Sequence, residues 1–396
     1  MIAAVVLAVL VTTPAAADPP AAADRARCAG VAEATGGRAD QRPIPDQLLR
    51  RCLRLNQIQV IGTHNSYKQP VVPEIFALLR AFDPALASSL EYSHPPLAHQ
   101  LATQEVRQLE LDVFADPEGG RYAPRIGLDV AGVANPTPPE LLEPGFKTLH
   151  VQDLDFATSC LTFVACLEQV DAWSDANPGH LPVAVLVELK DDPIPDPFDF
   201  GFTVPLSIGS AELDALDAEI RSVFDDDELL TPDDVRRGRA TLEQAVLDDG
   251  WPRLRAAQGQ VLFLMDNGGS LRDRYRAGRP SLEGRVLFTN AEPGSPDAAF
   301  VKVNEPVGAI DRIRSLVNDG YVVRTRADEP TVQARTGDTT QRDAAFASGA
   351  QWVSTDYPVP GSSPFSDYYA SIPDGNPARC NPVNTGPRCR NQGIEP

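Results

Sequence analysis

The chain has 396 residues and a formal net charge of -20, with 42% hydrophobic and 23% charged residues, a balance typical of globular proteins. The excess of acidic residues argues against nucleic acid as a partner, because binding to phosphate backbones needs a basic surface. So many carboxylates instead suit a cation such as calcium or magnesium.

Residues 1–17 predict a signal peptide. The apolar run from Ile2 to Val11 is too short to span a bilayer, and Ala15-Ala16-Ala17 offers a cleavage site after Ala17. The basic residues that usually precede such a run are missing. We expect a secreted, extracellular protein in which residues 18–50, without clear periodicity, form an N-terminal arm.

Six cysteines fit an oxidising compartment. They permit three disulfides, and the fifteen connectivities of six cysteines stay open from sequence alone. Local pairing is the simplest arrangement, and a bond across a six-residue separation requires that no continuous helix joins its two cysteines. The locally paired set is Cys28–Cys52, Cys160–Cys166 and Cys380–Cys389.

Short apolar runs rich in β-branched and aromatic residues follow at intervals, each about as long as a buried strand. There are eight of them: Ile58–Ile61, Val106–Phe114, Thr148–Val151, Val183–Leu189, Val261–Met265, Val286–Phe288, Tyr321–Thr325 and Trp352–Ser354. Helical stretches separate several runs: one over 211–224 capped by Ser210, one starting at Thr231-Pro232, and one over 310–317.

Alternating strands and helices predict an α/β fold, a (β/α)8 TIM-type barrel over residues 51–360. An open, doubly wound sheet is the competing fold, but no glycine-rich nucleotide motif follows an early strand. Long insertions at about 68–105 and 191–260 are expected on the active face. Residues 361–396 are expected to form a disulfide-stapled C-terminal tail.

Polar side chains stand at the ends of the first four runs. In a parallel barrel the carboxyl ends of the strands converge on one site. Each motif alone has an ordinary structural interpretation, such as a surface salt bridge between Glu188 and Lys190, but their joint placement favours a site. The residues brought together are His64, Asn65, Glu110, Asp112, His150, Glu188 and Lys190.

The oxygen-bearing members of this set predict a calcium site. Glu110 and Asp112 are two residues apart on one strand, so their side chains point the same way. Such a buried pair of carboxylates is costly unless a cation neutralises it. Asn65 and Glu188 add further oxygen ligands, which calcium prefers, whereas magnesium demands stricter geometry and zinc favours nitrogen or sulfur.

Several motifs, in this order, resemble the calcium-dependent phosphoinositide-specific phospholipases C of bacteria: GTHNSY (62–67), PPLAHQL (95–101), VRQLELDV (106–113), LHVQDLDF (149–156), VELK (187–190), RTRAD (324–328) and STDY (354–357). The resemblance covers about residues 50–360. It implies the phosphodiesterase barrel that this family shares with glycerophosphodiester phosphodiesterases. It also implies one calcium ion on Asn65, Glu110, Asp112 and Glu188, and a catalytic pair, His64 and His150.

The family's chemistry implies a role for these residue types. Cleavage of phosphatidylinositol to diacylglycerol uses the inositol 2-hydroxyl as the nucleophile, and it leaves a cyclic inositol phosphate that water can open. Two imidazoles near neutral pKa suit the required base and acid, and calcium assists the attack. Which histidine is the base stays open, and a carboxylate ligand is an alternative base.

Four further polar residues are candidates for contact with substrate or support of the site. Lys190 could bind a ring hydroxyl or phosphate, or only pair with Glu188. One of Arg324 and Arg326 is expected to face the interior and bind phosphate. Strand closure would place Asp356 beside His64, which it could orient, although capping the following turn is an alternative role.

Two other functions remain open from sequence: a glycerophosphodiester phosphodiesterase acting on soluble deacylated substrates, and a barrel that binds phosphoesters without cleaving them. We expect a monomer. Transient contact with a membrane surface would use apolar residues of the two long insertions, or else these residues pack within the insertions: Phe76, Leu78, Leu79, Phe82, Phe198, Phe200 and Phe202.

Overall fold

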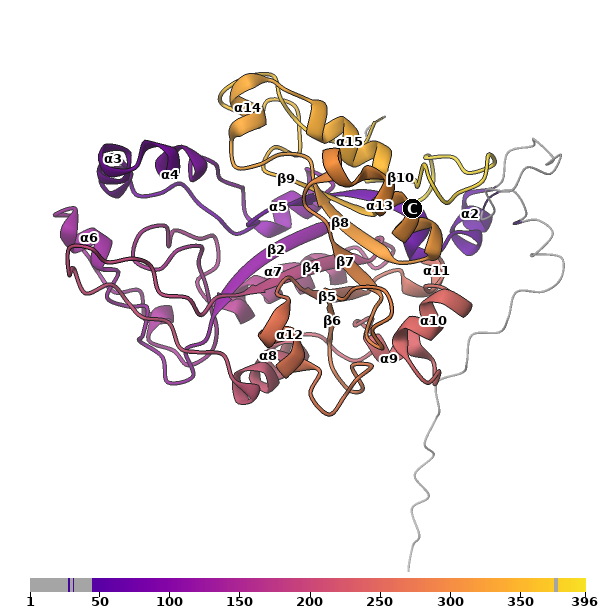
Figure 1. Ribbon diagram of the computed structural model, residues 1–396, viewed down its shortest axis with the longest axis horizontal. Helices are drawn as coiled ribbons and strands as arrows, with labels where there is room; N and C mark the ends of the chain where they lie inside the picture. Colours follow the sequence, from indigo (N-terminus) through magenta and orange to yellow (C-terminus); the bar gives the residue numbers. More distant parts are fainter. Residues whose placement is uncertain (1–27, 29–30, 32–44, 374–376) are drawn as a thin grey trace, which may run out of the picture.

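The computed structural model describes residues 28, 31, 45–373 and 377–396, so the predicted signal peptide and most of the predicted arm lie outside the described residues. Eight parallel strands form a nearly closed barrel with helices around it (Figure 1). Their order around the barrel is β6-β5-β4-β2-β1-β9-β8-β7. The strands are β1 (Ile58–Thr63), β2 (Gln108–Phe114), β4 (Val183–Leu189), β5 (Val261–Met265), β6 (Leu287–Thr289), β7 (Phe300–Lys302), β8 (Val322–Arg326) and β9 (Trp352–Thr355).

The barrel prediction is confirmed, but the third predicted strand is wrong. Only β3 (Lys147–Thr148) forms there, and it pairs antiparallel with the end of β2 instead of joining the parallel barrel. The eighth barrel strand is β7, which the sequence prediction missed. Between β6 and β7 the described residues form a single β-bridge, Asn290 to Phe300, and the barrel is least tightly closed there.

The strands are held by burial on both faces, as expected for a parallel sheet under helices. β5 is wholly buried, and so are all residues of β4 except Glu188. The helices are α2 (Asp46–Cys52), α3 (Pro73–Phe82), α4 (Pro84–Ser89), α5 (Leu97–Ala102), α6 (Ile126–Val130), α7 (Phe163–Ala176), α8 (Ser210–Val223), α9 (Pro232–Arg236), α10 (Leu242–Asp248), α11 (Leu254–Ala257), α12 (Gly269–Tyr275), α13 (Pro306–Asp319), α14 (Val332–Thr336) and α15 (Thr340–Ser348), with short 3₁₀ turns at Leu55–Gln57 and Pro139–Leu141.

Local signals account for several helix ends. Thr231 caps α9 and Pro232 occupies its first turn, as predicted. α13 ends at Gly320, whose φ of 109° suits glycine. The predicted cap of α8 is off by one residue, because Ser210 is already helical and the Glu212 side chain accepts a hydrogen bond from the Gly209 N–H (2.8 Å). No helix of the described chain is both long and apolar enough to cross a bilayer.

A second hydrophobic cluster lies outside the barrel core, on the side where α3, α4 and α6 project (Figure 1). It joins the segment after β1, the segment after β2 and residues 149–156. Its buried members are Val71, Ile75, Leu90, Phe114, Tyr122, Leu128, Leu149 and Phe156. We call this the side lobe; it is built from the connections that leave the carboxyl ends of β1 and β2.

The C-terminal segment packs at the opposite end of the strands. β10 (Ala378–Cys380) pairs antiparallel with the start of β1. Glu395 accepts a hydrogen bond from Arg107 Nε (2.8 Å) just before β2 begins. The locally paired disulfides are confirmed: Cys28–Cys52, Cys160–Cys166 and Cys380–Cys389.

Candidate active site

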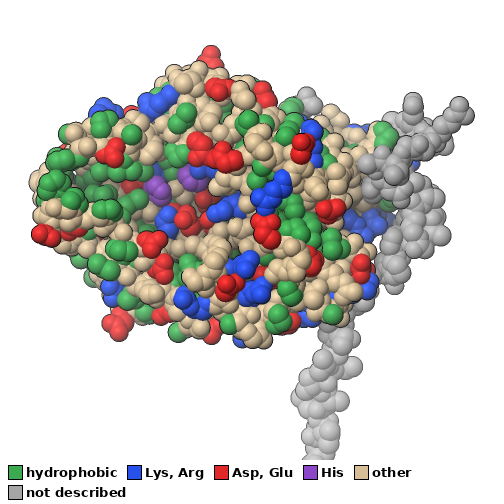
Figure 2. Space-filling view, viewed as in Figure 1, with side chains coloured by type: hydrophobic (Ala, Val, Ile, Leu, Met, Phe, Trp, Pro, Cys, Tyr) green, Lys and Arg blue, Asp and Glu red, His purple; other side chains and the backbone are tan. Residues whose placement is uncertain are grey.

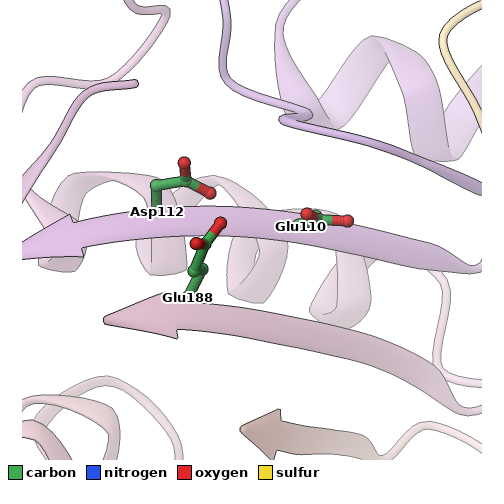
Figure 3. Close-up of side chains that lie close together, drawn as sticks. All are labelled: Glu110, Asp112 and Glu188. Atoms are coloured by element: carbon green, nitrogen blue, oxygen red, sulfur yellow. The ribbon is translucent and has the colours of Figure 1, made fainter. Parts of the chain in front are cut away.

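Three carboxylates meet at the carboxyl ends of β2 and β4 (Figure 3). Glu110 and Asp112 project from the same side of β2, and Asp112 stands opposite Glu188 in the parallel register. One oxygen from each lies within 4.8 Å of the others. Asp112 is fully buried and Glu110 is 3% exposed. The strand-parity prediction therefore places these three side chains correctly.

Two basic side chains neutralise this cluster. Lys190 Nζ lies 3.3 Å from Asp112 Oδ2 and 3.2 Å from Glu188 Oε1. Burial alone would lower the pKa of Lys190, but the carboxylates of Asp112 and Glu188 raise it above its ordinary value. Arg324 Nη2 pairs with Glu110 Oε2. Lys190 thus forms the pair with Glu188 that its sequence allowed, and it also pairs with the buried Asp112.

Replacing Lys190 with methionine is expected to lower the stability of the calcium-free protein by about 2 kcal/mol, because the buried Asp112 loses its ion-pair partner. It should also enlarge the rise in Tm that calcium produces, since a positive charge that opposes the ion is gone. Thermal unfolding in chelator and in calcium measures both effects. Lys190→Arg keeps the charge and is the control; equal calcium shifts in Lys190→Met and wild type would contradict the expectation.

The unpaired oxygens of the cluster fit a bound cation. Asp112 Oδ1 and Asn65 Oδ1 are buried without a hydrogen-bond partner, and Lys190 is the cation that lies beside Asp112 Oδ2. Burial raises the pKa of Asp112 well above its usual range, and it raises that of Glu110 to about 7. Asn65 Nδ2 donates to Tyr92 Oη (2.7 Å), which fixes the amide. An all-oxygen set with orphaned buried atoms is what calcium would satisfy.

His64 follows β1 and is held by a buried carboxylate at the end of β9. Its Nδ1 lies 2.9 Å from Asp356 Oδ1, and its Nε2 lies 3.9 Å from Glu110 Oε1. The ring stacks on Tyr92, with centroids 5.6 Å apart. Burial first, and then the nearby arginines and His150, hold the pKa of His64 well below its ordinary value. The imidazole is therefore neutral near pH 7, with Nε2 on the side of the carboxylate cluster.

His150 lies in the turn after β3, not at the end of a barrel strand. Its Nδ1 lies 2.7 Å from Asp155 Oδ2. The same oxygen lies 3.2 Å from the Nζ of Lys68, a fully buried lysine that also donates to Leu90 O (3.0 Å). Asp155 and Lys68 were not predicted from the sequence. Asp155 could have been found, because it lies only five residues after His150.

Asp155→Asn is expected to lower kcat by about 10²-fold, because an amide does not stabilise the imidazolium of His150 as a carboxylate does. KM should change little if Asp155 acts only through His150. Initial-rate kinetics measure both quantities. A kcat within about twofold of wild type would contradict a supporting role for Asp155.

The two arginines of β8 both face the barrel interior. Arg324 is 1% exposed, and its Nη1 donates to Asn304 Oδ1 (2.7 Å). Arg326 is 5% exposed and its Nη2 lies 3.4 Å from Asp356 Oδ2. The expectation that only one of them faces inward is wrong, because residues two apart on a strand share a face. Asp356 holds both His64 and Arg326.

The cluster opens into a hollow on the side of the barrel where the side lobe lies. A cavity of about 310 Å³ is lined by His150, Glu188, Lys190, Phe114 and Asn267, among others. Figure 2 shows histidine side chains in a hollow of this face, with hydrophobic side chains gathered around it. The cavity is large enough for a small polar head group beside His150 and Glu188.

Apolar side chains of the two insertions divide between exposed and packed positions. Phe82, Phe198 and Phe200 are 70%, 59% and 40% exposed. Their rings form a row, with centroids 5.7 Å apart for Phe82–Phe198 and 5.6 Å apart for Phe198–Phe200; Phe202 continues it. Phe76 and Leu79 instead pack against the side lobe. Leu78 is half-buried.

Comparison with known proteins identifies one matching family. The family model "Phosphoinositide phospholipase C, Ca2+-dependent" matches residues 53–382, most of the chain. No curated protein matches the sequence.

Among solved structures, the chain is similar to the calcium-dependent phosphoinositol-specific phospholipase C of a Pseudomonas species (16% identity, 77% of this chain and 90% of that chain covered, TM-score 0.47). It is also similar to a Ca2+-dependent phosphatidylinositol-specific phospholipase C from Streptomyces antibioticus (18%, 77% and 95%, TM-score 0.47). A glycerophosphoryl diester phosphodiesterase from Parabacteroides distasonis is more distant (10%, 80% and 90%, TM-score 0.28). On the match of the family model, the chain belongs to the Ca2+-dependent phosphoinositide phospholipase C family of enzymes.

Proposed function

We propose that this chain cleaves phosphatidylinositol, or a close relative, to diacylglycerol and a cyclic inositol phosphate. The observation that carries the proposal is the pairing of two histidines, each held through Nδ1 by a buried carboxylate, with an all-oxygen cation site between β2 and β4. Its membership of the family supplies the substrate class.

The side chains have the properties that the reaction needs. Asp356 and Asp155 occupy the Nδ1 atoms of His64 and His150, which leaves each Nε2 to take or give a proton. One histidine takes the proton of the inositol 2-hydroxyl, and the other protonates the departing diacylglycerol oxygen. Glu110 lies 3.9 Å from His64 Nε2 and is an alternative base.

One calcium ion is proposed to bind Asn65, Glu110, Asp112 and Glu188. When bound there it would neutralise phosphate charge and lower the pKa of an attached hydroxyl. The cationic side chains of Lys190 and Arg324 pair with carboxylates of this site, and that of Arg326 pairs with Asp356. We propose that all three contact phosphate or ring hydroxyls once the metal neutralises the carboxylates. Such contacts fit the planar, forked donors of the arginines.

Phosphorus NMR of the protein with phosphatidylinositol micelles, in calcium and then in excess chelator, tests the proposal. A cyclic phosphodiester resonance that requires calcium would support internal attack by the inositol hydroxyl. A signal only from glycerophosphoinositol would move the function to soluble diesters. No new resonance with either substrate would mean that the barrel binds phosphoesters without cutting them.

We propose that the enzyme is secreted and works at a membrane surface. Three disulfides support an oxidising compartment. Seven of the ten exposed large apolar residues of the described chain fall within residues 82–204, the part that supplies the connections around the hollow: Phe82, Leu86, Val130, Leu142, Phe198, Phe200 and Val204. An apolar rim around a polar hollow suits a head group that projects from a lipid layer.

Replacing Phe198 and Phe200 together with serine is expected to weaken binding to phosphatidylinositol vesicles by about tenfold, since each exposed aromatic ring contributes burial in the lipid. Cleavage of a monomeric short-chain substrate should not change. Vesicle sedimentation and parallel assays measure the two effects. Val307→Ser and Val332→Ser, exposed changes outside residues 82–204, are the control. Equal loss on both substrates would contradict a role confined to lipid contact.

A further inference from the structure

One tight turn connects His150 to the rim of the hollow. The Val151 N–H donates to Asp155 O (3.0 Å) and the Asp155 N–H donates to Val151 O (2.9 Å), which closes the turn. Asp155 holds the His150 ring from within this turn. Asp153 lies between them, 3% exposed, with a φ of 66°. The turn thus carries two acidic residues with different partners.

The Asp153 carboxylate binds two segments that lie far from it in sequence. Its Oδ2 accepts from the Thr203 N–H (2.6 Å), and its Oδ1 accepts from Thr203 Oγ1 (3.2 Å) and from the Ile126 N–H at the start of α6 (2.8 Å). The backbone approaches α6 closely too: a Cβ on Gly127 would lie 2.1 Å from Asp153 O. Hydrogen bonds to a buried carboxylate are short and strong.

Thr203 directly follows Phe202, in the segment that carries the row of exposed aromatic residues. We call residues 196–204 the aromatic loop; it carries Phe198, Phe200 and Phe202. Asp196 organises the loop from within by accepting from the N–H groups of Phe200 (2.9 Å) and Gly201 (2.8 Å). The described contacts of Asp196 are all inside the loop, whereas Asp153 is the side chain that fastens the loop to the His150 turn.

We propose that Asp153 is a positioning residue that transmits contact between the aromatic loop and a lipid surface to His150. Lipid that immobilises the loop would, through Thr203 and Asp153, immobilise the turn that carries His150 and Asp155. Misplacing a proton-transfer group by a fraction of its hydrogen-bond length lowers the rate steeply. The proposal rests on the proposed function for its link to catalysis, and it adds how the enzyme senses the surface on which its substrate lies.

Hydrogen exchange of the wild-type chain tests the coupling without any turnover. Phosphatidylcholine vesicles are added, and exchange is followed at the amides of Val151, Asp155 and Thr203. We expect slower exchange at all three with vesicles present. Protection at Thr203 without protection at Val151 and Asp155 would overturn the proposal, even if the chain cleaves phosphatidylinositol. Coupled protection in a chain that cleaves no lipid would refute the proposed function and leave the coupling standing.

Asp153→Asn tests the catalytic consequence. Asparagine accepts the positive φ, so the backbone is preserved, but its NH2 group cannot accept from Thr203 or Ile126. On vesicles we expect kcat to fall about tenfold while KM and the bound fraction change less than about twofold. The coupled slowing of exchange at Val151 and Asp155 should disappear.

Asp196→Asn is the matched control, the same chemical change on the other side of the loop. It should weaken vesicle binding and leave kcat at saturating lipid unchanged. The proposal fails if Asp153→Asn retains wild-type kcat, or if it lowers only vesicle binding as Asp196→Asn does. A wild-type kcat in Asp153→Glu, together with slowed exchange at Val151 and Asp155 when vesicles are present, would support a role specific to the carboxylate.

Discussion

His64→Ala is expected to lower kcat for phosphatidylinositol by about 10³-fold while leaving calcium affinity nearly unchanged. The ring presents its free Nε2 to the carboxylate cluster, 3.9 Å from Glu110 Oε1, because its Nδ1 is already taken by Asp356. Its depressed pKa keeps it neutral, so the alanine variant removes a proton acceptor without removing a charge. Single-turnover kinetics and calcium titration calorimetry measure the two quantities.

His94→Gln is the control for this change. His94 Nε2 lies 2.9 Å from the His64 carbonyl oxygen, so this ring nitrogen is engaged with the backbone and is not free to take a proton from substrate. Glutamine can still donate to that carbonyl, and kcat should stay within about threefold of wild type. If His64→Ala keeps a kcat within tenfold of wild type, proton transfer belongs to another group, and Glu110 is the nearest candidate. Partial rescue of His64→Ala by free imidazole would confirm the role of the ring.

The sequence predicts well what depends on strand parity and strand order. Glu110 and Asp112 share a face of β2, and Glu188 comes from the strand beside it, so a parallel barrel brings the three together whatever the loops do. The same parity, applied to Arg324 and Arg326, would have placed both inside the barrel. The prediction that only one arginine faces the interior was therefore wrong because the parity of the strand was misapplied, although the sequence contained the information.

Loops explain what the sequence predicts poorly. His150 lies beside the other candidates, but a two-residue antiparallel strand and a tight turn put it there, not a barrel strand. Lys68 reaches Asp155 across the fold, and no local pattern shows that contact. β7 was also missed, although it is no shorter than β6, which was predicted. Residues that support the site act through contacts between distant parts of the sequence, whereas the positions of ligands at strand ends follow from the order of the strands.

Asp112→Asn is expected to weaken calcium binding by about 10²-fold, because ligand charge sets the affinity of such oxygen sites over several decades. Activity at limiting calcium concentrations should fall with it. The same change should raise the Tm of the calcium-free protein. Asp112 is fully buried, and burial raises its pKa well above its usual range even beside Lys190, so its charge costs stability in the absence of the ion. Lys190 keeps Glu188 as a partner after the change.

Opposite signs in the two readouts distinguish a metal ligand from a structural carboxylate. A carboxylate that serves the fold through Lys190 would lower the Tm when it is neutralised, with calcium and without it. If the carboxylate is instead a metal ligand, neutralising it raises the Tm of the calcium-free protein and abolishes the rise in Tm that calcium produces. Thermal unfolding in chelator and in calcium separates these cases. Glu188→Gln, at a side chain that is 31% exposed, should show the same loss of the calcium effect with a smaller gain in chelator, since less desolvation is relieved there.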